Sequence, residues 1–376
     1  MSIDGLGTIL AGVCVALAVT GALALLWDRI RIIGRSTLIA AMVLSIAATA
    51  GLELNRLTET YPTWAALADD KAYADPGPTP VATPSSHTRV DAEMPIGRPG
   101  NGRVATYLVP GPASKMTMPM IVYLPAAYFT PEGQSLDFPV IEALHGYPGT
   151  PEAWIKRLDI AGHLDREIAA GRMAPTVVLL PYQTTDRLLD TECTNLTGGP
   201  QAETYLTVDV PAWARSHLRI RTDRAAWGLT GYSAGAFCAM NLVLKHPNQY
   251  AAAASLSGFA GPGITIGDHS ETTTNNIAWR LSHLAPPPVA LWIGWADDDR
   301  SARNGSRSIV ALAKPPITVA TAKVPRGGHS GQVWKQMEGP AFDWLSAHLA
   351  RPAPHNYPAP HIGPAPHTGP DGARHP

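Results

Sequence analysis

Two long stretches without a charged residue lie close to the amino terminus and constrain the architecture of the chain most strongly. The first, TILAGVCVALAVTGALALLW, covers residues 8–27 and holds 20 uncharged positions. The second covers residues 36–52 and holds 17. A helix needs about 20 predominantly apolar residues, with a range of roughly 17–25, to cross the hydrocarbon core of a bilayer. The pattern therefore predicts a hairpin of two transmembrane helices within residues 1–54.

The segment between these stretches, DRIRIIGRS, carries Arg29, Arg31 and Arg35. Short loops rich in arginine stay on the cytoplasmic side of a membrane. We therefore expect the amino terminus, and everything after residue 52, to lie on the extracytoplasmic side of the plasma membrane, with lipid contact through the two helices. Two alternatives stay open. The Ala-Thr-Ala sequence at 48–50 resembles the cleavage site of a signal peptide, and the two stretches also suit a buried hairpin in a soluble protein.

Proline-rich segments flank the remainder of the chain. Residues 55–99 include PGPTPVATPSS, a composition typical of semi-rigid linkers. Residues 351–376 contain the six-residue units PAPHNY, PAPHIG and PAPHTG. A Pro/His/Gly tract of this kind cannot bury a core, so we expect a disordered tail. Its histidines, His355, His361 and His367, are expected to be solvated, with metal chelation in vitro as the alternative.

The charge balance bears on the class of partner. The formal net charge of the 376-residue chain is -1, and its body has no cluster of lysine and arginine. Proteins that bind nucleic acid usually present a basic patch or stripe. We therefore expect no nucleic acid partner.

Residues 100–350 alternate between apolar runs rich in β-branched residues and segments with helical character. The runs VIEALHG, TVVLLPY, AAWGLTG, PVALWIGW and ITVATAKVP read as buried parallel strands. RVATYLV and PMIVYLP read as an antiparallel opening to the sheet. Helices are predicted over 151–170, 203–217, 234–245, 301–313 and 331–348. This alternation predicts an α/β fold, a three-layer sandwich with right-handed crossovers.

The sequence Gly231-Tyr232-Ser233-Ala234-Gly235 matches the pattern G-x-S-x-G. The pattern is weak evidence by itself, but here it follows an apolar strand and precedes a helix, as a nucleophile elbow requires. Small residues at both ends avoid clashes in the tight turn. We predict that Ser233 is a catalytic nucleophile. The alternative is a glycine-rich turn with an incidental serine.

A serine hydroxyl needs a base, and the remaining partners should follow in the order acid, then histidine. His329 lies in RGGHSG, directly after the last predicted strand, and is the expected base. The acid should follow the preceding strand, where Asp297, Asp298 and Asp299 are adjacent. We favour Asp297, with Asp298 as the main alternative, and expect the others to cap the helix that begins near residue 301.

The oxyanion of an acyl intermediate needs hydrogen-bond donors. We expect the backbone N–H groups of Ala234 and Tyr147 to provide them, because the second donor usually lies in the loop after an earlier strand. The side chain of His145 in that loop is expected to be structural.

No ligand spacing for zinc surrounds the cysteines. If the domain is exported, Cys193 and Cys238 are expected to form a disulfide. Cys14 lies in the first apolar stretch, where we expect it to act as a small hydrophobic residue. Two separately buried thiols are the alternative.

Several segments together resemble the putative-esterase family of α/β-hydrolases, which includes esterase D, feruloyl esterases and secreted mycolyltransferases. They are LHGYPGTPEAW, TYLTVDVPAW, LTGYSAGAFCAMNLVLKHPNQYAAAASLSG, LWIGWADDD and GGHSGQVW. The resemblance covers roughly residues 100–350 and implies an α/β-hydrolase fold, the triad Ser233, Asp297 and His329, and no cofactor. Mycolyltransferases differ in having aspartate where this chain has His145, and tryptophan where it has Gly331.

These observations lead to a serine carboxylic-ester hydrolase that acts on an ester or acyl-donor substrate. The first alternative is an acyltransferase, resembling the mycolyltransferases, that moves acyl groups between lipid or sugar alcohols. A serine peptidase is a weaker alternative. A non-catalytic surface or adhesion module on the same fold belongs to a different functional class.

Overall fold

The computed structural model describes residues 6–58, 100–186 and 188–355, together with Ile3, Trp64, Leu67 and the pair 81–82. Most of the predicted linker, and the tail beyond residue 355, lie outside the described residues. His361 and His367 therefore lie outside them as well.

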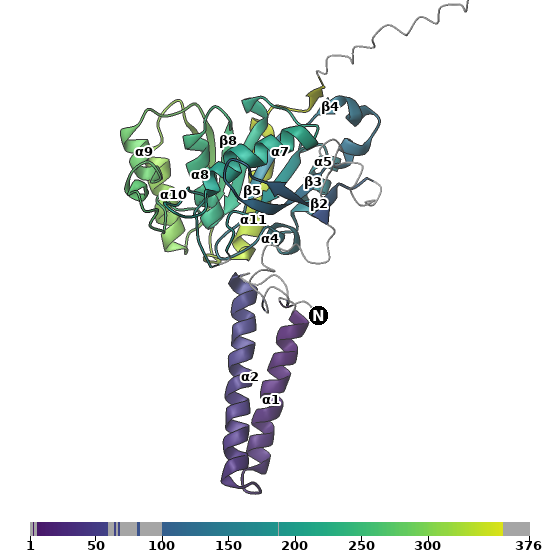
Figure 1. Cartoon of the computed structure of the whole chain (residues 1–376), viewed down its shortest axis with the longest axis vertical. Coiled ribbons are helices and arrows are strands. Elements are labelled where there is room, and N and C mark those ends of the chain that lie inside the picture. The colour runs from purple at the N-terminus through teal and green to yellow at the C-terminus, as the bar shows by residue number, and fades with distance from the viewer. Residues whose placement is uncertain are drawn as a thin grey trace, which may run out of the picture.

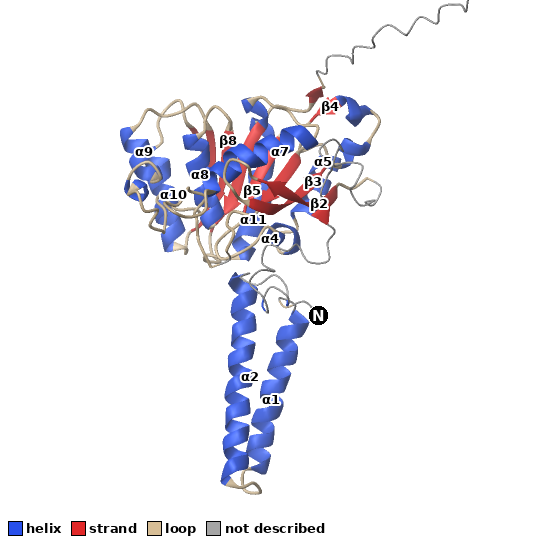
Figure 2. Cartoon of the chain, in the orientation of Figure 1, coloured by secondary structure: helices blue, strands red, loops and turns tan. Residues whose placement is uncertain are grey.

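A nine-stranded sheet forms the centre of the α/β domain (Figure 2). Its order is β1-β2-β3-β6-β5-β7-β8-β9-β10. The strands are β1 (Val81–Ala82), β2 (Arg103–Pro110), β3 (Thr117–Leu124), β5 (Val140–Leu144), β6 (Val177–Pro181), β7 (Trp227–Tyr232), β8 (Ala252–Leu256), β9 (Ala290–Ala296) and β10 (Thr318–Val324). β3 pairs antiparallel with β2 and with β6, and the pairs from β6 through β10 are parallel. The α/β-hydrolase fold expected from the sequence is confirmed.

The central strands are apolar because both of their faces are covered. Every residue of β5, β6, β7 and β8 is buried. By contrast, β10 is the last strand of the sheet, and its residues are exposed or partly buried except for Val324, which is buried. Runs of buried β-branched and small residues suit parallel strands that lie between two helical layers.

Helices cover both faces of the sheet and create two cores. One core contains side chains of α7, α8, α9 and α10, among them Trp213, Phe237 and Ile309. The other contains side chains of α4, α5 and α11, among them Trp154 and Phe342. The helices are α4 (Glu152–Lys156), α5 (Ile160–Ala169), α6 (Ala202–Thr204), α7 (Val210–His217), α8 (Ala234–Lys245), α9 (Ile277–His283), α10 (Arg300–Leu312) and α11 (Gly331–His348). Shorter turns are η3 (Ala126–Phe129), η4 (Glu132–Ser135), η5 (Tyr205–Asp209), η6 (Arg224–Ala226) and η7 (Ser270–Thr272).

The helical hairpin at the amino terminus consists of α1 (Leu6–Leu26) and α2 (Ile32–Thr58) and projects away from the α/β domain (Figure 1). Both helices are long and apolar enough to cross a membrane. They approach closely at Gly12, where an added Cβ would lie 2.7 Å from Oγ1 of Thr49. Small residues of this kind let membrane helices pack backbone against backbone.

The chain just after residue 350 is more ordered than a disordered tail over 351–376 implies. Strand β11 (Ala353–Pro354) pairs antiparallel with β4 (Leu136–Asp137). Nδ1 of His355 lies 2.5 Å from Oδ1 of Asp137. The predicted boundary at residue 351 was therefore wrong by a few residues, because a short strand pairing is invisible in a proline-rich repeat.

Candidate active site

Ser233 occupies the sharp turn between β7 and α8. Its φ of 56° and ψ of -122° lie outside the regions that residues with a side chain prefer. The turn is held because the N–H of Ser233 donates to the carbonyl oxygen of Leu256 at 3.0 Å. A Cβ at Gly231 would lie 2.1 Å from the carbonyl oxygen of Gly235, and one at Gly235 would lie 2.2 Å from that of Leu144. The strained turn therefore requires glycine at both ends, as in a nucleophile elbow.

His329 reaches Ser233 from the loop that follows β10. Its Nε2 lies 2.7 Å from Oγ of Ser233. Two glycines precede it, Gly327 with φ 132° and Gly328 with φ 62°, a backbone that other residues adopt with strain. The imidazole ring contacts two aromatic rings, with centroid distances of 5.7 Å to Phe259 and 5.2 Å to Trp334. These contacts restrict the ring to an orientation that faces the serine.

The acid next to the histidine is Asp299, and the sequence-based choice of Asp297 is corrected accordingly. Oδ2 of Asp299 lies 2.6 Å from Nδ1 of His329. The other oxygen accepts the N–H of Ala302 at 3.2 Å and so caps α10. The Asp299 side chain is only 6% exposed. The carboxylate that was expected to serve only as a helix cap therefore performs both tasks.

Asp297 points elsewhere. Its Oδ1 accepts the indole N–H of Trp295 at 3.3 Å, and its backbone N–H donates to Val324 across the ends of β9 and β10. The residue is exposed. The strand pairing thus continues to position 297 and turns this side chain away from His329.

Asp298 supports the histidine loop. Its two carboxylate oxygens accept the backbone N–H groups of Gly327 at 3.0 Å and of Gly328 at 2.9 Å. These two hydrogen bonds hold the pKa of Asp298 below its ordinary value, because they favour the ionised form. Sequence reasoning considered Asp298 as a triad acid or as a cap of the following helix, and it missed this role.

Comparison with known proteins agrees with this geometry. The profile of the putative-esterase family matches residues 112–357. The chain belongs to the putative-esterase family. An uncharacterized protein of Corynebacterium glutamicum is 24% identical over 242 residues, which cover 60% of this chain and 56% of that protein. The chain thus spans little more than half the length of this relative.

Two solved structures resemble the esterase domain in fold. A ferulic acid esterase superposes with a TM-score of 0.57 at 18% identity, over 66% of this chain and 99% of that one. The S-formylglutathione hydrolase from Agrobacterium tumefaciens superposes with a TM-score of 0.57 at 18% identity, over 68% and 98%. Together with the family match, these similarities show a chain of the putative-esterase family with the fold of these two enzymes.

The loop after β5 approaches Ser233 from a second side. A Cβ added to Gly146 would lie 3.1 Å from Cβ of Ser233. His145 is buried, which lowers its pKa to about 4, and its Nδ1 donates to the carbonyl oxygen of Gly146 at 2.8 Å. The side chain of His145 therefore stays neutral and shapes the loop. The hydroxyl of Tyr147 donates to the carbonyl oxygen of Leu188 at 2.7 Å.

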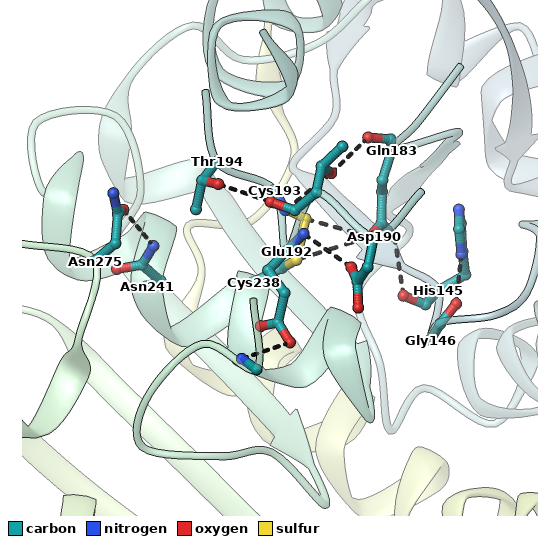
Figure 3. The surroundings of a disulfide bond; sticks show 12 residues. His145, Gly146, Gln183, Asp190, Glu192, Cys193, Thr194, Cys238, Asn241 and Asn275 are labelled. Carbon is teal, nitrogen blue, oxygen red and sulfur yellow. Dashed lines mark hydrogen bonds between the residues drawn. A yellow bond between two sulfur atoms is a disulfide. The ribbon is translucent and has the colours of Figure 1, made fainter. Parts of the chain in front are cut away.

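A disulfide joins Cys193 to Cys238, as the sequence predicted, and links the loop after β6 to α8 (Figure 3). Cys14 is a free cysteine on α1. Next to the disulfide, Nε2 of Gln183 donates to the carbonyl oxygen of His145 at 3.1 Å. The disulfide region thereby also supports the loop that approaches Ser233. Gln183 was missed because nothing in its local sequence distinguishes it from a surface glutamine.

Two carboxyl groups lie in the same loop (Figure 3). Burial and the charge of Asp190 raise the pKa of Glu192 to about 8, and burial also raises the pKa of Asp190. Oε1 of Glu192 accepts the N–H of Gly263 at 3.2 Å. This contact joins the loop after β6 to the loop after β8, which also carries Phe259. Within the described part of the chain, no group of three or more His, Cys, Asp or Glu side chains is arranged to hold a metal ion.

Proposed function

We propose that this chain is a membrane-anchored, extracytoplasmic serine esterase that hydrolyses carboxylic esters through an acyl-enzyme. The observation that carries the proposal is the continuous line of hydrogen bonds from Ser233 through His329 to Asp299, with distances of 2.7 and 2.6 Å. This is the arrangement of nucleophile, base and orienting acid that defines a serine-hydrolase triad.

Each member of the triad has a role that follows from its position. Oγ of Ser233 attacks the ester carbonyl while Nε2 of His329 takes the hydroxyl proton. Asp299 fixes the imidazole with its proton on Nδ1 and stabilises the imidazolium that forms. His329 then returns the proton to the departing alcohol as the carbon–oxygen bond breaks. Water repeats the sequence on the acyl-enzyme and releases the carboxylic acid and free Ser233.

Two backbone N–H groups are proposed to bind the developing oxyanion. Ala234 is the first residue of α8, so its N–H has no acceptor within the helix. The N–H of Tyr147 follows Gly146, which lies against Ser233. Donors at such positions act where charge develops, and removing one typically costs about 10²–10³ in kcat.

An acyltransferase would use the same residues but admit an alcohol in place of water. The side chain of His329 is 34% exposed, so the base is accessible to either acceptor. Product analysis separates the two. A p-nitrophenyl ester incubated with and without a lipid or sugar alcohol gives only free acid if hydrolysis dominates, and a new ester if transfer does.

A fluorophosphonate probe tests the catalytic proposal and decides against the non-catalytic alternative. Such probes modify an activated serine, so the wild-type chain should be labelled while Ser233→Ala and His329→Ala are not. A matched control is Ser257→Ala, which changes a buried serine on the neighbouring β8 loop. Labelling that survives in Ser233→Ala would refute the proposed nucleophile.

The proposed location is supported by the apolar hairpin and by the disulfide, since disulfides persist mainly in oxidising compartments. An alkaline phosphatase reporter, which is active only after export, is expected to be active when fused after Pro376. The same reporter fused after Arg31, between α1 and α2, should be inactive. The intact mass of the membrane-bound protein distinguishes an anchor from a cleaved signal. Activity of the Arg31 fusion alone would reverse the topology.

A further inference from the structure

A groove with a cationic lining runs between α10 and the edge strand β10, beside the turn that carries the three aspartates. Its volume is about 370 Å³, within the range of roughly 300–1,000 Å³ typical of small-molecule sites. Arg303, Arg307 and Lys323 line it together with Trp295 and Asp297. The three basic residues and Asp297 together give the lining a formal net charge of +2.

The cations converge because of the elements that carry them. Arg303 and Arg307 are four residues apart on α10, so they lie on one face of the helix. Lys323 is an exposed residue near the end of β10, and its Nζ lies 5.6 Å from the ring centroid of Trp295. The groove therefore combines two guanidinium groups, one ammonium group and an aromatic wall.

These cations are not neutralised within the described part of the chain. A guanidinium nitrogen of Arg303 donates to the backbone carbonyl oxygen of Asp297 at 2.6 Å, but its Nε is buried without a partner there. The side chain of Arg307 forms no ion pair or hydrogen bond with any described residue. The carboxylate of Asp297 accepts from the indole N–H of Trp295. Asp297 offsets only one of the three positive charges, and the remaining excess favours binding of an anion.

We propose that this groove binds the phosphoryl group of a small phosphate monoester. A dianionic phosphoryl group matches the net charge of +2, whereas a carboxylate matches only half of it. Arginine forks bind phosphate oxygens in pairs, and lysine adds a point charge. The remaining volume accommodates the organic part against Trp295. The inference goes beyond the proposed function, because this ligand does not have to be hydrolysed.

Equilibrium dialysis of the full chain in detergent, with radiolabelled glycerol 3-phosphate at constant ionic strength, tests the proposal. Saturable binding is expected. Arg307→Ala and Lys323→Ala should each weaken it roughly ten- to hundredfold, the effect of losing a hydrogen bond to a charged group. Lys314→Ala, which removes an exposed charge between α10 and β10 outside the groove, should leave it unchanged. Arg307→Lys keeps the positive charge, so it should bind more tightly than Arg307→Ala. This result would show that the loss in Arg307→Ala comes from the missing charge and not from misfolding.

Two further arms complete the experiment. Ser233→Ala should bind glycerol 3-phosphate normally while hydrolysis is lost, so a failed esterase assay does not bear on the groove. In vesicles of phosphatidylcholine, added phosphatidic acid should compete with glycerol 3-phosphate if the natural ligand is a lipid head group, and should have no effect if it is a free phosphate monoester. The proposal is overturned if the wild-type chain shows no saturable binding, or if Lys314→Ala weakens binding as much as Arg307→Ala.

Discussion

The carboxylate of Asp299 joins two elements, because one oxygen lies 2.6 Å from Nδ1 of His329 and the other caps α10 at the N–H of Ala302. The same side chain thus fixes the start of a helix and the orientation of the proposed base. A carboxylate held at both oxygens has little freedom to rotate, so the imidazole receives a well-positioned partner.

We predict that Asp299→Asn lowers kcat for a p-nitrophenyl ester by about 10⁴-fold, the loss seen when the acid of a serine-protease triad becomes an amide. Asparagine remains a good helix cap, so the fold should persist. Asp297→Asn is the matched control and should change kcat only a few-fold, since Asp297 does not contact His329. The opposite ranking in steady-state assays would restore Asp297 as the acid.

Asp298 should affect catalysis through the histidine loop alone. Asp298→Ala removes the acceptors for the N–H groups of Gly327 and Gly328, which lets His329 move away from Ser233. A displacement of about 1 Å in a catalytic group costs up to roughly 10²-fold in rate. We expect Asp298→Asn, which keeps one acceptor, to lie between alanine and wild type. Rates of fluorophosphonate labelling measure this order, and equal rates for all three would contradict it.

Local sequence pattern led to the prediction of both Ser233 and His329, whose side chains lie 2.7 Å apart in the structure. An apolar strand, a turn of small residues and an apolar helical segment follow one another around Ser233, and the glycines before His329 indicate a loop. The choice among three consecutive aspartates depends instead on where the β9–β10 pairing stops. That pairing extends to the N–H of Asp297, and so the next turn directs Asp299 inward. The Asp-Asp-Asp sequence itself does not indicate where this pairing ends.

Two of the predicted helices are interrupted in the structure, for a related reason. The single helix predicted over 151–170 is two helices, interrupted at Asp159, whose φ is 58°. The one predicted over 203–217 contains the π-helical turn η5 between α6 and α7. Helix α8, by contrast, was predicted at its observed bounds. It is buried along nearly its whole length, so its apolar pattern is unbroken, whereas the other two contain breaks set by tertiary packing.

The disulfide should contribute substantially to stability. It closes a loop with a sequence separation of 45, for which chain-entropy models give about 4 kcal/mol. We expect the double change Cys193→Ser and Cys238→Ser to lower the free energy of unfolding by roughly that amount in urea titrations. Cys14→Ser is the control, because Cys14 is unpaired on α1. A loss no larger than that of the control would show that the two loops are held by other contacts.

Glu338 should make stability depend on pH. The side chain is 1% exposed on α11, and neither carboxylate oxygen has a hydrogen-bond partner in the described structure. Burial raises its pKa to about 9. Between the ordinary pKa of about 4.3 and this value, the folded state holds a proton that the unfolded state has released. The free energy of unfolding therefore falls as the pH rises through this window, by at most about 1.4 kcal/mol per pH unit from this group.

Glu338→Gln replaces the titrating carboxyl group with an amide that does not titrate, and it keeps the shape of the side chain. We predict that the variant matches wild type near pH 5 and is more stable than wild type at pH 8, as measured by urea unfolding in detergent. The difference between the two proteins is the quantity to compare, because the raised pKa values of Glu142 and Glu192 add their own slopes to both. Glu132→Gln, at an exposed position in η4, is the control and should follow the wild-type curve. If the free energies of unfolding of wild type and Glu338→Gln differ by the same amount from pH 5 to pH 8, Glu338 is ionised in the folded protein.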